Sequence, residues 1–193
     1  MIIGICGLIG SGKDTIADIL IKHKGFVKLS FSKILKDIVS ILFDWDRNLL
    51  EGNTTNSRKW RNTIDIFWTQ KFGFDITPRF VLQFIGTDLF RNHFHQDFWI
   101  LLLEKQLLKY DNIVISDCRF PNEIQLLRKY NSIIINVRRN TPPWFFDYIN
   151  YKIDKPINIH ESEYIWIREK FDYIINNDYD INTLQNNILN LLK

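Results

Sequence analysis

The stretch that decides the fold is residues 2–15, which read IIGICGLIGSGKDT. It begins with a short apolar run bounded by glycine, which is typical of a strand buried on both faces. Gly7, Gly12 and Lys13 then match the phosphate-loop pattern, and apolar residues at helical spacing follow over residues 13–23. A strand, this loop and a helix in direct succession predict a binding site for the phosphates of a nucleotide.

The spacing of the loop has a chemical reason. Glycines at both ends let the backbone turn tightly, so that successive N–H groups point inward at phosphate oxygens. The helix that starts near Lys13 directs the positive end of its dipole at the same anion, and the Lys13 ammonium can reach the β- and γ-phosphates. The residues expected to bind ATP are Gly7, Gly10, Ser11, Gly12, Lys13, Asp14 and Thr15.

Position 14 departs from the general pattern. A Ser or Thr usually follows the loop lysine and binds Mg²⁺ through its hydroxyl, whereas here Asp14 stands there and Thr15 follows. The departure argues against a GTPase or a motor ATPase. Nucleoside monophosphate kinases as a group often lack this hydroxyl and hold the metal largely through water. We therefore expect Mg²⁺ to accompany ATP without a direct protein ligand.

Outward from the loop, strand and helix patterns alternate. Apolar runs predict further strands at residues 26–31, 113–117, 132–137 and 171–176. Helical patterns cover residues 32–43, 122–130 and 181–192, and the long interval without a strand pattern includes helices at 78–92 and 97–109. The alternation predicts a three-layer α/β fold with a five-stranded parallel sheet and a helical insertion, and the glycine loop makes it a phosphate-loop NTPase.

The chain of 193 residues is expected to form a single phosphate-loop domain over 1–193, because its length suits one domain and no linker interrupts it. A helical insertion is expected over about 44–110, and an irregular flap or lid over about 138–160. The polar segment 51–57 is predicted to be an exposed loop, and residues 160–163 are predicted to start a helix capped near Glu161 or Ser162.

The composition excludes several classes of protein. Hydrophobic residues make up 46% and charged residues 24%, which excludes disorder, collagen and coiled coil. No apolar run reaches membrane-spanning length, and no basic segment precedes the apolar start as in a signal peptide. The net charge of +3 is too small to indicate nucleic acid by itself. Cys6 and Cys118 are expected to be buried packing residues in a reduced, cytoplasmic protein.

Polar side chains follow the third predicted strand, at the sheet edge where ligands of open α/β sheets bind. Asp117 is a candidate for holding a water on Mg²⁺ or for accepting from a sugar hydroxyl, and Arg119 for neutralising a transferred phosphoryl group. The structural alternative for Asp117 and Arg119 is a surface ion pair between them. Glu123 is a further candidate, and its structural alternative is an acid in the first turn of a helix, which the helix dipole favours. Arg138 and Arg139 follow the next predicted strand. They are candidates for lid arginines, and the alternative is a solvated pair.

A second group of candidates lies in the helical insertion. Arg79 and Gln83 are four residues apart, so both face the same side of a helix. An arginine fork matches a monophosphate, glutamine can bind a base edge, and glycine permits close approach to the backbone. The candidate substrate-binding residues here are Arg79, Gln83, Gly86, Thr87, Arg91 and Trp99. The alternatives are a solvated helix face with a structural glycine and, for Trp99, core packing.

Taken in order, the loop, the segments TPR and QFIGTD within residues 77–88, the later Trp99 and SDCRFPNE at residues 116–123 resemble the deoxynucleoside monophosphate kinase family of phages and large DNA viruses. GKDT at residues 12–15 and HESE at residues 160–163 are specific parts of this resemblance. It implies a phosphate-loop kinase fold, with ATP, Mg²⁺ and a deoxynucleoside 5′-monophosphate (dNMP) as partners, and hence the reaction of ATP and dNMP to ADP and dNDP.

The resemblance also implies roles. The loop residues would serve ATP, and Lys13, Arg119 and Asp117 would be the catalytic residues. The acceptor and the transfer would be served by Arg79, Gly86, Thr87, Trp99, Asp117, Arg119 and Glu123. For a virus, the expected compartment is the cytoplasm of the host cell.

Two other readings stay open. One is a phosphate-loop kinase whose acceptor is dephospho-coenzyme A, phosphomevalonate or a nucleoside. The other is a non-catalytic nucleotide-binding module or single-strand binder, which needs an exposed aromatic platform, whereas aromatic residues here are expected mostly inside. Neither nucleic acid nor a membrane is expected as a partner. Trp45, Trp60 and Trp68 leave a homodimer interface open.

Overall fold

The computed structural model describes residues 1–191, and the chain forms two compact units. The first unit combines Met1–Phe31 with the chain from Ile100 onward, and the second is Ser32–Trp99. The expectation of one kinase domain over residues 1–193 stays a prediction. None of the helices within residues 1–191 is both long and apolar enough to cross a bilayer.

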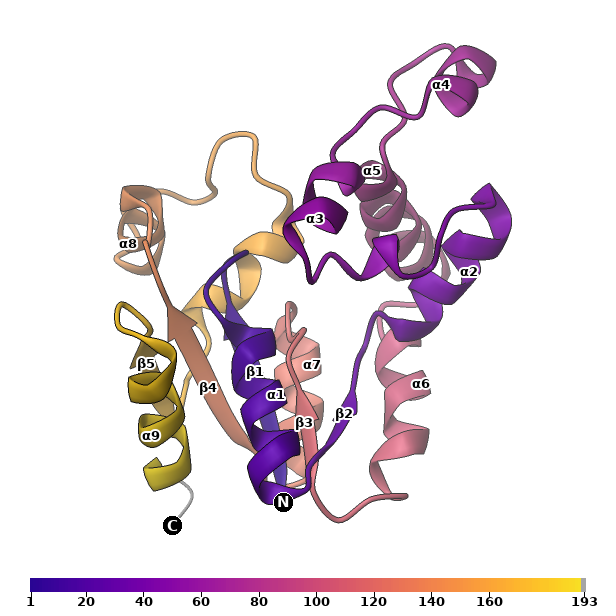
Figure 1. Cartoon of the computed structure of the whole chain (residues 1–193). Coiled ribbons are helices and arrows are strands. Elements are labelled where there is room, and N and C mark those ends of the chain that lie inside the picture. Colours follow the sequence, from indigo (N-terminus) through magenta and orange to yellow (C-terminus); the bar gives the residue numbers. More distant parts are fainter. Residues whose placement is uncertain (192–193) are drawn as a thin grey trace. The chain divides into compact units, whose positions relative to one another are not determined.

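The first unit is built on a parallel sheet in the order β2-β3-β1-β4-β5 (Figure 1). Its strands are β1 (Ile2–Gly7), β2 (Val27–Leu29), β3 (Ile113–Ile115), β4 (Ile133–Arg138) and β5 (Tyr173–Asn176). The five-stranded parallel sheet predicted from the sequence is therefore confirmed, although β2 and β3 end earlier than expected. Because β1 is the central strand, the loop that follows it emerges at the middle of the sheet edge.

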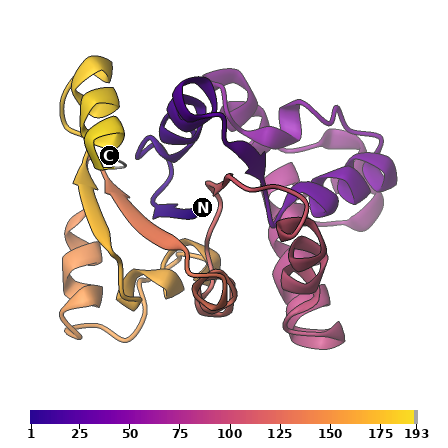
Figure 2. The same cartoon turned by 90° about the horizontal axis from the view of Figure 1, so that it is seen from below.

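Helices cover both faces of this sheet (Figure 2). One face packs against α1 (Lys13–Lys24) and α9 (Ile181–Leu191) through a core that includes Ile5 and Leu20. The other face packs against α6 (Phe98–Leu107), α7 (Pro121–Lys129) and α8 (Pro143–Ile149). The predicted three-layer fold is thus confirmed. Residue 192, which the prediction included in the closing helix, lies outside the described residues.

The second unit, Ser32–Trp99, consists of helices joined by loops and contains no strand among its residues, and the acceptor-binding insertion expected over about 44–110 stays a prediction. Its elements are α2 (Lys33–Phe43), η1 (Leu49–Glu51), α3 (Thr55–Arg61), α4 (Ile66–Phe72), α5 (Pro78–Gln83) and the π-helix η2 (Phe84–Phe94). The helix expected over 78–92 therefore forms, but it widens to π geometry after Gln83. Trp45 is buried in this unit, where its Nε1 donates to Asp65 Oδ2 at 2.8 Å.

Three local expectations are wrong. Segment 51–57 is not a single loop, because Thr54 and Ser57 form a capping box that starts α3 at Thr55. The segment expected to be irregular over about 138–160 contains the helix α8 (Pro143–Ile149), and its role as a flap or lid stays a prediction. Residues 160–163 form only the short 3-10 helix η3 (Glu161–Glu163), and its cap is His160, whose side chain accepts from Ser162 N.

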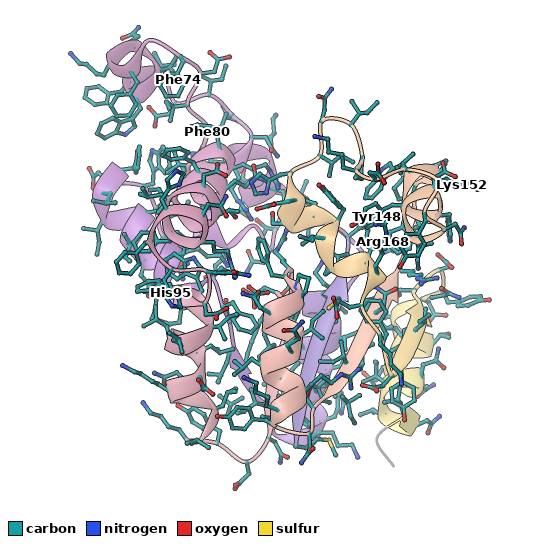
Figure 3. All side chains as sticks on the ribbon, turned by 180° about the vertical axis from the view of Figure 1, so that it is seen from behind. Phe74, Phe80, His95, Tyr148, Lys152 and Arg168 are labelled. Carbon is teal, nitrogen blue, oxygen red and sulfur yellow. The ribbon has the colours of Figure 1, made fainter. Side chains whose placement is uncertain are left out.

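Several phenylalanines of the second unit are exposed, contrary to the expectation that aromatic residues lie mostly inside. Phe72, Phe74, Phe80 and Phe84 are 39–53% exposed. Consecutive rings in this run have centroids 5.8–6.3 Å apart, and Figure 3 labels its two middle members. An exposed run of aromatic rings is the surface that the single-strand-binder alternative requires.

Candidate active site

The loop between β1 and α1 has the geometry of an anion cradle. Gly10 and Gly12 have φ angles of 79° and 103°, in the left-handed region that favours glycine. No described side chain caps α1 at Gly12, so the positive end of the helix dipole faces the loop. Ser11 is 1% exposed, and its hydroxyl oxygen is buried without a hydrogen-bond partner within residues 1–191. An orphaned buried hydroxyl in an amide-lined loop fits a bound phosphate.

Lys13 is folded back against the loop. Its side chain is buried, and Nζ donates to the backbone oxygen of Leu8 at 2.8 Å. Burial, followed by the nearby positive charge of Arg119, lowers the pKa of Lys13 to about 8. A desolvated ammonium that is held by one neutral carbonyl is poised to bind a more negative ligand.

Asp14, which stands where a metal-binding hydroxyl is usual, is held by other side chains. Its Oδ1 accepts from Lys28 Nζ at 2.9 Å and from Ser116 Oγ at 2.8 Å. Burial opposes ionisation of Asp14, but the hydrogen bond and charge of Lys28 outweigh it and lower the pKa. Asp14 thus links the start of α1 to β2 and to the residue after β3.

Asp117 and Arg119 both lie just beyond β3 but have different partners. Asp117 accepts from Ser30 Oγ at 2.7 Å and from the N–H of Phe31 at 3.2 Å. Arg119 Nη1 donates to Glu163 Oε1 at 2.6 Å, and the Glu163 charge is the largest cause of the raised pKa of Arg119. This ion pair joins the loop before α7 to η3.

Glu123 lies in the first turn of α7, as its structural alternative proposed. The residue is buried, and Oε2 accepts from the N–H groups of Arg119 at 2.7 Å and Phe120 at 3.2 Å. Its carboxylate therefore fixes the backbone that carries Arg119. The role of Glu123 in acceptor binding stays a prediction.

The two arginines at the end of β4 differ in environment. Arg138 donates from Nε to Asn136 Oδ1 at 2.7 Å, and its guanidinium carbon lies 5.2 Å from the ring centre of Phe145. Burial lowers its pKa. Arg139 is exposed. The lid role predicted for both is untested by this arrangement.

Some candidate residues of the second unit are buried in its interior and others are half-buried. Arg79 Nε donates to Asn62 Oδ1 at 2.6 Å, and Gln83 is half-buried one turn later on α5. Trp99 is buried and donates from Nε1 to the backbone oxygen of Gly86 at 2.8 Å. Thr87 and Arg91 are also buried, and Arg91 donates to the backbone oxygen of Gln96 at 3.3 Å. The burial of Trp99 agrees with core packing, which was the structural alternative for this residue. A contact between Trp99 and the substrate stays a prediction.

Sequence reasoning missed four side chains of the first unit that hold this edge together: Lys28, Ser116, Glu163 and Asn177. Glu163 and Ser116 could have been found, because Glu163 ends the HESE segment and Ser116 begins the SDCRFPNE segment. Lys28 in β2 and Asn177 after β5 are single polar residues with no motif to mark them. No group of three or more His, Cys, Asp or Glu within residues 1–191 is arranged to hold a metal ion.

A parallel sheet whose central strand runs into a glycine loop, a buried lysine and a helix defines the phosphate-loop class of nucleotide-binding proteins. Comparison with protein families gives the same class and narrows it. A family model described as deoxynucleotide monophosphate kinase matches residues 51–188, more than half of the chain. The chain belongs to the deoxynucleotide monophosphate kinase family and is an enzyme that transfers a phosphoryl group to a nucleotide.

Two relatives come from viruses. A protein of Acanthamoeba polyphaga mimivirus that carries the name deoxynucleotide monophosphate kinase is 31% identical over 152 residues, which cover 72% of this chain and 74% of that protein. Deoxynucleoside-5′-monophosphate kinase of Escherichia phage T5 is 26% identical over 195 residues, covering 71% and 77%. Among solved structures, dephospho-CoA kinase from Campylobacter jejuni aligns over 99% of this chain and 95% of its own, with 14% identity and a TM-score of 0.41.

Proposed function

We propose that this enzyme transfers the γ-phosphoryl group of ATP to a deoxynucleoside 5′-monophosphate and releases ADP and a deoxynucleoside diphosphate. The observation that carries the proposal is the loop after β1, where a buried lysine and an orphaned buried hydroxyl stand beside left-handed glycines. Membership of the family supports the nature of the acceptor. The proposed compartment is the cytoplasm of an infected cell.

The proposed donor site comprises the loop and the start of α1. The Lys13 ammonium would leave the Leu8 carbonyl for the β- and γ-phosphates, since a charged acceptor forms the stronger hydrogen bond. The Ser11 hydroxyl and the amides near Gly12 would complete the phosphate contacts. Mg²⁺ bound with ATP would neutralise phosphate charge, and Asp117 is the side chain proposed to hold one of its waters.

Transfer between two phosphates needs little covalent help from the protein, so the proposed catalysis is positioning and charge neutralisation. The acceptor phosphate is largely dianionic at neutral pH and needs no base to make it nucleophilic. Arg119, held by Glu163 at 2.6 Å, is proposed to contact the transferred group. Arg138 and Arg139 are proposed to neutralise the leaving phosphates when the segment after β4 closes and excludes water.

The second unit is proposed to bind the acceptor. Arg79 would bind the monophosphate through its fork, while Gln83, one turn along the same helix, would hydrogen-bond the base. Thr87 and Arg91 are proposed to support these contacts from η2.

Replacing Arg79 by alanine is expected to raise the KM for the acceptor about tenfold or more, because a charge-assisted hydrogen bond to the phosphate is lost. The measurement is ADP release at varied dNMP concentration. Lys71→Ala, which removes an exposed cation from α4 of the same unit, is the matched control and should leave the acceptor KM unchanged. Unchanged KM and turnover in Arg79→Ala would remove this residue from the acceptor site.

The whole proposal is tested by a panel of acceptors given with ATP and Mg²⁺ and scored by ADP release. Each of the four dNMPs, the ribonucleotides, dephospho-coenzyme A, phosphomevalonate and nucleosides is offered separately. Acceptor-dependent ADP release with at least one dNMP is the expected result. Release with only a non-nucleotide acceptor would move the protein to another kinase activity.

The single-strand-binder alternative is tested with the same protein. The exposed run from Phe72 to Phe84 is the surface that would stack on bases. Salt-sensitive binding of a labelled oligonucleotide, combined with no acceptor-dependent ADP release, would favour this alternative.

The pH dependence of ATP binding should report Lys13. Its pKa is about 8 in the folded protein, against an ordinary value of 10.5. Only the ammonium attracts phosphate, so the Kd for ATP should be nearly constant below about pH 7 and rise about tenfold between pH 7 and pH 9. Lys13→Met should bind ATP weakly at both pH values with no such rise. An equal rise in Lys13→Met would assign the titration to another group.

The same shift predicts the effect of pH on the stability of the nucleotide-free protein. Between about pH 8 and 10.5 the unfolded chain binds more protons at Lys13 than the folded chain does. The contribution of this residue to the free energy of unfolding therefore rises with pH across that window.

A further inference from the structure

One buried side chain beside the loop has no part in the mechanism so far. Asn177 follows β5 directly and is 7% exposed. Its backbone N–H donates to the oxygen of Arg138 at 2.7 Å, which extends the pairing of β5 with β4 by one residue. The backbone of Asn177 is therefore fixed to the sheet, and its side chain starts from a rigid base.

The side chain of Asn177 contacts the phosphate loop. Nδ2 donates to the backbone oxygen of Ser11 at 2.9 Å, in a buried hydrogen bond between residues 166 positions apart. A Cβ at Gly12 would lie 2.3 Å from the same nitrogen. The amide of Asn177 thus occupies the space that any side chain at position 12 would need.

This hydrogen bond fixes the orientation of one peptide group. The carbonyl of Ser11 and the N–H of Gly12 belong to the same planar trans peptide, in which the two bonds point in opposite directions. When Asn177 holds the carbonyl on its own side, the N–H of Gly12 must point the other way. Gly12 has a φ of 103°, so its backbone has the freedom to let this peptide rotate once the donor is removed.

We propose that Asn177 is a positioning residue, which orients the Ser11–Gly12 peptide so that the N–H of Gly12 points at the phosphates of the bound donor. The inference rests on the proposed binding of ATP at this loop. It assigns Asn177 to the loop and not to the base of the nucleotide. Asn177 would act through Gly12 and would not itself touch the phosphates.

The experiment compares Asn177→Leu, which has a similar size and no donor, with Asn176→Leu, which changes the exposed neighbour in β5. The Kd values of ATP and of tripolyphosphate, which has no base or sugar, are measured by calorimetry. Asn177→Leu should weaken both ligands about tenfold, the effect of one lost hydrogen bond to a charged group. It should also raise the KM for ATP more than it lowers kcat. Asn176→Leu should match the wild type in all of these.

Three results would overturn the inference. Weaker binding of ATP with unchanged binding of tripolyphosphate would mean that Asn177 contacts the base or sugar. Unchanged binding of both in a variant that melts like the wild type would mean that the hydrogen bond has no effect on the loop. A wild-type protein that binds neither ligand would remove both the inference and the proposed donor site.

A second variant covers the case in which leucine disrupts folding. Asn177→Ser leaves room in the interior, and its hydroxyl is too short to replace the amide, so equal losses for ATP and tripolyphosphate are again expected. The inference and the proposed function can also fail separately. If both ligands show the expected losses but no dNMP is phosphorylated, the role of Asn177 stands and the proposed acceptor is wrong.

Discussion

Phosphoryl transfer by Lys13→Ala is expected to be about 10²–10³ times slower than by the wild type, the usual cost of losing one charged or hydrogen-bonding group from a transition-state site. The Lys13 side chain is buried and held by one neutral carbonyl, so its positive charge is the strongest that the loop itself offers to a triphosphate. ATP binding should weaken as well, because the β- and γ-phosphates lose their ammonium partner.

The fold should tolerate this change. Lys13 is desolvated in the absence of a ligand, and removing a buried charge with a lowered pKa relieves a cost to folding. Circular dichroism and the melting temperature should therefore match or exceed those of the wild type. Lys22→Ala removes an exposed lysine from the last turn of the same helix and is the control for the loss of charge alone. Near wild-type turnover in Lys13→Ala would show that the loop is not the donor site.

The second large effect is expected for Arg119→Ala, in which kcat should fall about 10²–10³-fold while the Kd for ATP changes little. A guanidinium at the end of β3 is proposed to meet charge that develops only during transfer, so the loss belongs to kcat. Single-turnover measurements with saturating ATP separate this loss from weaker binding.

Removing Arg119 also takes away the guanidinium that lies 2.6 Å from the Glu163 carboxylate. The double variant Arg119→Ala with Glu163→Gln removes that negative charge and should keep the same low kcat. Arg128→Ala breaks another arginine ion pair, with Asp172, at the other end of α7, and should leave kcat unchanged. A double variant that recovers most of the activity would show that the loss came from the exposed negative charge and not from the missing arginine.

Much of the fold could be predicted from local patterns. Most strands are short runs rich in isoleucine and valine, and α1 follows a loop whose glycines have a specific chemical use. The predictions were wrong where a residue type is typical both of loops and of helix starts. Pro142 and Pro143 lie in the segment expected to be irregular, yet proline is favoured at the first positions of a helix, and α8 starts there. Thr54 and Ser57 read as loop residues and instead cap α3.

The candidate site could be predicted only where its residues lie in a motif. The loop residues and Arg119 were named from spacing. Their partners are far away in the sequence: Ser116 is 102 residues from Asp14, and Glu163 is 44 residues from Arg119. Spacing along one chain cannot indicate such pairs, because the sheet brings them together only after folding. The π geometry of η2 could not be predicted either, because the spacing of apolar residues is similar in an α-helix and in a π-helix.

The bond from Asn177 to Ser11 sets an order of events during synthesis of the protein on the ribosome. The glycine loop leaves the exit tunnel first, but the residue that holds its peptide is translated 166 positions later. At about 5–20 residues per second, a nascent chain would wait roughly ten to thirty seconds for that contact. A partly translated chain therefore carries the complete loop sequence but lacks the bond that shapes it.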